Sequence, residues 1–226
     1  MSYLWNEFNI KTFPAETIVY RDGVFCPDLS TLPDTTIDHH TVLPVHVIYV
    51  GEISGENKLN LDIKFPHERV FLTAKIKNKK PAFLNIFIKN AGENSQCRGG
   101  IIIQNNDQFH LNISAQHDAP DTEILVHTKL IAHAKTRSIL SGVAQINENA
   151  PRSISDISFS AMADKTAHIE FRPTQRIGAA PISADHNASI YRATPPQIQF
   201  LRTAGLSTAE INDTLREAFE NSNPLF

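Results

Sequence analysis

The sequence predicts an all-β body followed by a small α-helical subdomain. Runs in which apolar and polar residues alternate fill residues 42–171, and no helical pattern separates them. Helix capping motifs and an apolar stripe at helical spacing appear only after residue 193. Strands without intervening helices argue against a wound α/β sheet, and they leave a sandwich, a barrel or a β-solenoid.

The predicted strands share one pattern, in which apolar and polar residues alternate. In residues 58–65, KLNLDIKF, every second side chain is apolar, as expected for a strand with one buried face. Similar runs, separated by Asn, Asp, Gly and Pro, are residues 68–78, 82–90, 98–106, 109–116, 122–135, 137–146, 155–161 and 167–171. No strict residue repeat accompanies the runs, so self-similarity does not select the solenoid over the sandwich or the barrel.

A first terminal helix is predicted over residues 194–204. Thr194 suits the N-cap, prolines occupy the first turn, and Gln197 stands at the capping-box position. Gly205 suits the end of this helix, because glycine readily adopts the left-handed conformation found there.

A second terminal helix is predicted over residues 207–221. Ser207 and Glu210 form another capping box, and the helix carries an apolar stripe of Ile211, Leu215 and Phe219. The simplest interpretation is that this stripe packs on the β body. A face that binds a partner protein is the alternative, and the stripe alone does not separate the two.

Composition limits the classes of partner. The 226 residues are 41% hydrophobic and 20% charged, as in ordinary globular proteins, and can bury a core without disulfides. A net charge of -3 offers no broad basic face, which disfavours nucleic acid and anionic membranes as partners. No window approaches the roughly 20 apolar residues of a membrane span, and the first residues lack a signal-peptide pattern. We therefore expect a cytoplasmic protein.

Thiols and catalytic motifs are scarce. Cys26 and Cys97 are the two cysteines, and they are far apart in the sequence, so metal chemistry would need ligands from another chain. The phosphate-binding loop, the nucleophile elbow, the H-E-x-x-H zinc motif and the dinucleotide-binding glycine motif are all missing. We therefore expect that the chain is not an enzyme.

Residues 183–211 carry a distinctive order of side chains. A strand-like part contains His186, Ala188 and Ser189, and the helix-like part after it contains Gln197, Phe200, Leu201, Arg202, Thr203, Gly205 and Leu206. This order resembles the most recognisable block of the SufB/SufD family of iron–sulfur cluster assembly proteins. Residues 17–34 resemble the entry segment of the SufD branch, so the chain is similar to a short, divergent, SufD-like member.

The resemblance implies a fold and partners. It implies a right-handed parallel β-helix at residues 42–193, an entry segment at 1–41 and a helical subdomain at 194–226. It also implies a non-catalytic scaffold that pairs with itself or a SufB-like paralogue and works with a SufC-like ATPase. The ATPase is expected to dock on the terminal helices through Phe200, Ile211, Leu215 and Phe219.

His186 is the best candidate for iron or cluster handling, because an imidazole is a good iron ligand and the resemblance places it near the subunit interface. No cofactor is expected to stay bound, although an iron ion or iron–sulfur cluster could be held transiently. Cys26 and Cys97 are weaker thiol candidates: Arg98 could favour the Cys97 thiolate, but an inert turn cysteine is the simpler interpretation.

The sequence departs from the family pattern beside His186. Ala184 stands where SufD proteins often have a cysteine, and Asn187 replaces a glycine. An architectural β-solenoid dimer without cluster chemistry is therefore one alternative function. A β-solenoid module that binds or acts on carbohydrate is another, although a single tryptophan, Trp5, outside the strand region argues against it.

Overall fold

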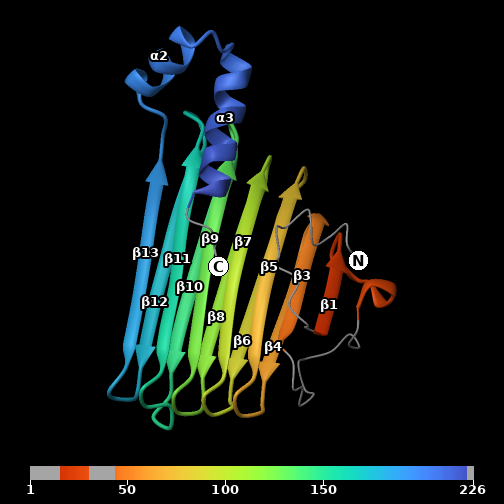
Figure 1. Ribbon diagram of the computed structural model, residues 1–226, viewed down its shortest axis with the longest axis vertical. Coiled ribbons are helices and arrows are strands. Elements are labelled where there is room, and N and C mark those ends of the chain that lie inside the picture. The colour runs from red at the N-terminus through yellow and green to blue at the C-terminus, as the bar shows by residue number, and fades with distance from the viewer. Residues whose placement is uncertain (1–15, 31–43, 223–226) are drawn as a thin grey trace.

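The computed structural model describes residues 16–30 and 44–222, and their strands wind into a parallel β-solenoid of about six turns (Figure 1). Sheet A holds β1 (Glu16–Arg21), β2 (Val24–Phe25), β3 (Val45–Glu52), β5 (Arg69–Asn78), β7 (Gln96–Asn105), β9 (Glu123–Ala132), β11 (Ile154–Ala163) and β13 (Ser183–Tyr191). Sheet B holds β4 (Gly55–Ile63), β6 (Ala82–Asn90), β8 (Gln108–His117), β10 (Arg137–Ile146) and β12 (His168–Ile177). The predicted β-helix is confirmed.

Successive strands from β3 onward alternate between the two sheets, so each pairs in parallel with the strand two places further along the chain. The offset between paired residues is 27 where Ala82 meets Phe109 and grows to 31 where Arg137 meets His168. The added residues lie in the longer connections at 147–153 and 164–167. This variable offset explains why no strict repeat is visible in the sequence.

The core fills the space between the two sheets. Alternate side chains of each strand point inward, as with Cys97, Ile101 and Ile103 of β7, and these residues are fully buried. Large rings such as Phe109 and Phe159 lie in the same interior. The period-two runs of the sequence therefore mark the inward faces.

The corners between the sheets repeat one backbone conformation. Four equivalent residues adopt a positive φ between 55° and 63°, and they are His67, Asn94, Asp121 and Arg152. The N–H of each donates to a carbonyl one turn further along the solenoid, for example Asp121 to Pro151 at 3.0 Å. Stacked corners thus extend the main-chain ladder beyond the strands.

Two helices follow β13, and both lie within a residue of their predicted limits. In α2 (Pro195–Thr203), the Gln197 side chain accepts from the Thr194 backbone N–H at 2.9 Å, and Gly205 follows with φ of 89°. In α3 (Thr208–Asn221), Ser207 and Glu210 form the expected reciprocal capping box. Within residues 16–30 and 44–222, no helix is long and apolar enough to cross a membrane.

The expected entry segment is continuous with the solenoid where the structure describes it. β1 pairs in parallel with β3 and extends sheet A, and the short β2 folds back antiparallel on β1. A short 3-10 helix, η1 (Pro27–Leu29), then packs on the outer side of sheet A through Leu29. Residues 31–41 of this segment lie outside the described residues.

A buried histidine lies at one corner. His117 ends β8, and its Nδ1 lies 2.8 Å from the hydroxyl oxygen of Thr122, which in turn contacts Ser153 at 2.8 Å. Its Nε2 is buried without a hydrogen-bond partner among the described residues. Burial lowers the pKa of His117 to about 4, because a charged ring would lose its hydration there.

This histidine predicts a pH dependence of stability. The folded-state pKa lies below the unfolded value of about 6.5, so the unfolded chain takes up the proton first. The free energy of unfolding should therefore be highest above pH 6.5 and fall towards pH 4, by about 3 kcal/mol at most from this residue. Denaturant unfolding at several pH values measures the slope.

His117→Asn is the test variant. The residue paired with His117 in the preceding turn is Asn90, so an asparagine side chain is already accommodated at the equivalent corner. The variant should be less sensitive to pH between 6.5 and 5. His168→Asn, at an exposed position of β12, is the matched control and should behave like the wild type. Equal slopes in His117→Asn and the wild type would contradict the assignment.

Candidate functional site

The C-terminal end of the solenoid is open. β12 and β13 are the last strands of their sheets, so each pairs on one side only within the described chain. Ile177 and Ile190 occupy inward positions of these strands, yet they are 50% and 47% exposed. Their register partners in the preceding turn, Ile146 and Ala161, are buried. This end therefore presents apolar side chains and unpaired strand edges together.

His186 lies at this open end. It occupies an inward position of β13, opposite Ile157, and is partly exposed. Its Nδ1 is 3.1 Å from the Ile157 carbonyl oxygen of sheet A, and its Nε2 is 3.0 Å from the Thr174 carbonyl oxygen of sheet B. The ring thus bridges the two sheets at their last turn.

Both ring nitrogens of His186 therefore face carbonyl oxygens. A neutral imidazole carries one N–H and can donate to only one of them. A metal ion would have to replace one of these hydrogen bonds, because it needs a nitrogen lone pair. Among the residues that the structure describes, no three His, Cys, Asp or Glu side chains gather in a way that could hold a metal ion. Iron bound at His186 would need further ligands from outside the described residues.

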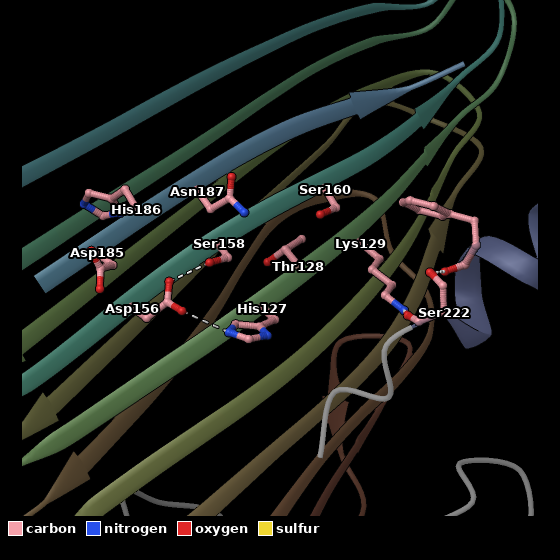
Figure 2. A pocket seen from close by; sticks show the side chains of 11 residues that line it. His127, Thr128, Lys129, Asp156, Ser158, Ser160, Asp185, His186, Asn187 and Ser222 are labelled. Carbon is pink, nitrogen blue, oxygen red and sulfur yellow. Dashed lines mark hydrogen bonds and ion pairs between the residues drawn. The ribbon is translucent and has the colours of Figure 1, made fainter. Parts of the chain in front are cut away.

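A polar pocket lies beside this end, on the outer face of sheet A (Figure 2). His127 Nε2 is 3.2 Å from a carboxylate oxygen of Asp156, and the Ser158 hydroxyl donates to the other oxygen at 2.5 Å. Asp185 of β13 is the register partner of Asp156, so its side chain belongs to the same outer face. Sequence reasoning missed this cluster, because His127, Asp156 and Asp185 meet only through the strand register.

Cys97 belongs to the core. The prediction that it lies in a turn is wrong, since it points inward from the middle of sheet A in β7 and is fully buried. Burial raises the pKa of its thiol to about 12. The neighbouring Arg98 points to the opposite face and donates to Glu123 at 2.7 Å, so it does not favour a Cys97 thiolate. The structure gives Cys97 no access to a cluster.

Cys26 lies at the other end of sheet A. It precedes η1, is partly buried, and packs with Leu29 against Val19, Ile48 and Val50. In the strand order of sheet A, β1 and β2 end the sheet opposite β13. The three candidate iron or thiol residues, Cys26, Cys97 and His186, are therefore not brought together within one chain.

The four candidate docking residues differ in exposure. Phe200 of α2 is 72% exposed, and no residue of α2 is buried. Ile211 of α3 is only 2% exposed, and Leu215 and Phe219 are half-buried. The stripe of α3 is thus largely covered by the chain itself, whereas α2 presents a free aromatic side chain.

Comparison with models of protein families identifies a match. A family model described as "SUF system FeS cluster assembly, SufBD core domain" matches residues 73–219. The matched region runs from β5 to α3, so it includes the open end, His186 and both helices. No curated protein matches the chain.

Proposed function

Since this chain belongs to the SufBD core domain family of SUF iron–sulfur cluster assembly, we propose that it is a non-catalytic scaffold subunit that works with a SufC-like ATPase in the cytoplasm. Members of this family are generally non-catalytic assembly components. The observation that carries the proposal is the open end of the solenoid, where His186 lies between two unpaired strand edges within the described chain. The family match gives the carbohydrate alternative no support.

The open end is suited to pairing with a second copy or a SufB-like paralogue. An edge strand with unpaired N–H and C=O groups is a template for another strand. β13 offers nine residues of such an edge. Ile190 of β13 and Ile177 of β12 are exposed beside it. A partner solenoid would satisfy the edge and cover the apolar residues in one contact.

Substitution of Ile190 with glutamate should prevent this pairing. A buried carboxylate without a partner is strongly unfavourable at an interface, so the dissociation constant should rise by roughly 30-fold or more. Light scattering of the chain alone, and of the chain mixed with a SufB-like paralogue, measures the association. Ile154→Glu is the matched control, because Ile154 is 43% exposed on β11, one strand away from the edge. A wild-type chain that stays monomeric at high micromolar concentration, with or without the paralogue, would refute the pairing.

We further propose that His186 handles iron or a cluster transiently, with the remaining ligands supplied by the partner subunit. Its place at the open end supports this role, and the burial of Cys97 leaves no thiol nearby among the described residues. The purely architectural dimer is the second candidate. It is favoured by the two carbonyl oxygens that already contact the ring and by Ala184 at the position where SufD proteins often carry cysteine.

The variant His186→Ala separates these two functions. If the histidine is a ligand, the purified complex should retain several-fold less iron, while folding and pairing stay intact. Iron content by elemental analysis and pairing by light scattering are the two measurements. His110→Ala is the control, because it removes a histidine from β8, two strands away from the edge of sheet B, and His110 does not line the pocket that His186 shares with His127. Unchanged iron content in His186→Ala would favour the architectural role.

The helical subdomain is the proposed dock for the ATPase. The resemblance places the ATPase contact in this region, and the exposure of Phe200 makes α2 the more accessible of the two helices. Leu215 and Phe219 are half-buried, so they can add only part of their surface to such a contact. Ile211 contributes through the packing of α3 and not directly.

Phe200→Ala should weaken binding of the ATPase at least tenfold, because truncating an aromatic anchor at an interface costs on the order of 2 kcal/mol. Titration of the purified ATPase by calorimetry measures the effect. Phe83→Ala deletes the same side chain from a 42% exposed position on β6 and should bind like the wild type. Equal affinities for Phe200→Ala and the wild type would show that α2 is not the dock.

A further inference from the structure

Helix α3 lies over the outer face of sheet A at the carboxyl ends of its strands, near β9 (Figure 1). Lys129 and Ile131 of β9 and Met162 of β11 occupy outward positions, yet all three are buried. The other outward residues of these two strands are half-buried or exposed. Ile211 is the one buried residue of α3, and the hydrogen bonds from Lys129 to the Glu220 and Ser222 carbonyls place the end of the helix over this patch.

The last turn of α3 is held by a polar clasp. The Glu220 carboxylate accepts from Gln104 Nε2 at 2.9 Å and lies 3.4 Å from Lys75 Nζ. Lys129 Nζ donates to the backbone carbonyls of Glu220, at 2.8 Å, and Ser222. A lysine at a helix C-terminus satisfies carbonyl groups that have no partner within the helix and favours the helix dipole. Three adjacent strands, β5, β7 and β9, therefore each supply one group to the clasp.

A second contact lies one turn earlier in the helix. Arg216 Nη2 is 3.7 Å from the Asp164 carboxylate, and its Nη1 is 3.5 Å from Asp213 of the same helix. His133 Nδ1 approaches Asp164 at 3.9 Å. These long separations make this contact weaker than the clasp.

The contacts of α3 differ in kind from those of the strands. They consist of one buried isoleucine, half-buried Leu215 and Phe219, the buried Lys129, and ion pairs of Lys75 and Arg216 that lie nearer the surface. Salt screens such surface ion pairs, and their strength is modest. The hydrogen-bond ladder between β9 and β11 is complete without α3, so loss of the helix would break no pairing within the sheet. Elements with few buried contacts open locally before the core does.

We propose that α3 is a strap that leaves the outer face of sheet A while the solenoid stays folded, and that the clasp of Lys129 and Glu220 sets how often it does so. Release uncovers Ile131 and Met162 on the sheet together with the stripe of Ile211, Leu215 and Phe219 on the helix. The strap is a property of this chain alone. Its test needs neither the ATPase nor a second subunit, so its failure is distinguishable from failure of the proposed function.

Hydrogen exchange of the full chain, read by mass spectrometry on peptides that cover 208–222, measures the release. Glu220→Gln and Lys129→Met should speed exchange in α3 by about tenfold. Raised salt should speed exchange in the wild type and have less effect on the two variants. Glu217→Gln makes the same charge change at an exposed position of the same helix and should leave exchange unchanged. Equal exchange in Glu220→Gln and Glu217→Gln would overturn the proposal.

A thiol reagent reports on the solenoid in the same samples. Cys97 is fully buried in the core, so its labelling, followed by mass spectrometry, shows whether the body has opened. The strap model requires fast exchange in α3 while Cys97 stays unlabelled. If α3 exchanges only when Cys97 reacts and strands β7, β9 and β11 exchange with it, the helix is part of the cooperative core and the proposal is wrong.

Discussion

The parallel stacking of turns is the constraint on which the rest of the structure depends. Each strand satisfies its backbone groups with the strand one turn before and the strand one turn after, so a stack of turns cannot close on itself. At the start of sheet A, the chain folds β2 back on β1 and adds η1. At the other end, within the described chain, β12 and β13 have no further strand. The unpaired edges of β12 and β13 are the reason that we propose the last turn as the surface for pairing.

The same stacking decides where chemistry can occur. The interior is filled by alternating apolar side chains, which bury Cys97 and hold His117 uncharged near neutral pH. Neither group can exchange ligands with solvent in the folded state. His186 has the same inward orientation, but it belongs to the last turn, so its ring faces the end of the core and not its middle. An inward position becomes chemically accessible only where the stack stops.

The sequence allowed both helices and most of the strands to be predicted, because period-two alternation and capping boxes are local signals. β3 (Val45–Glu52) was not among the predicted runs, and β12 continues to Ile177, beyond the predicted end at residue 171. The winding itself is not local: the spacing between stacked residues changes from 27 to 31, so it leaves no repeat to read. Cys97 was assigned to a turn, whereas β7 begins at Gln96 and includes it. In the structure, a side chain at Gly99 would press against Val126 at 3.2 Å, so this glycine serves close packing inside β7. The outer pocket needed the register of three strands, which no pattern along the chain supplies.

The sequence left open, for the terminal helices, whether they pack on the β body or bind a partner. In the structure, α3 packs on the body and α2 is exposed. An apolar stripe at helical spacing indicates a buried face, but it does not say whether the burying surface belongs to the same chain. Here Ile211 is buried within the chain itself, and Phe200 is left in solvent on a helix with no buried residue. Gly205, with φ of 89°, turns the chain between the helices, and α2 does not rest on the sheet through buried residues of its own. A load applied to α2 would therefore reach the β-solenoid by two routes: along the short connection to β13, where the Tyr191 hydroxyl donates to Gln197, and through α3 with the polar groups that hold its last turn.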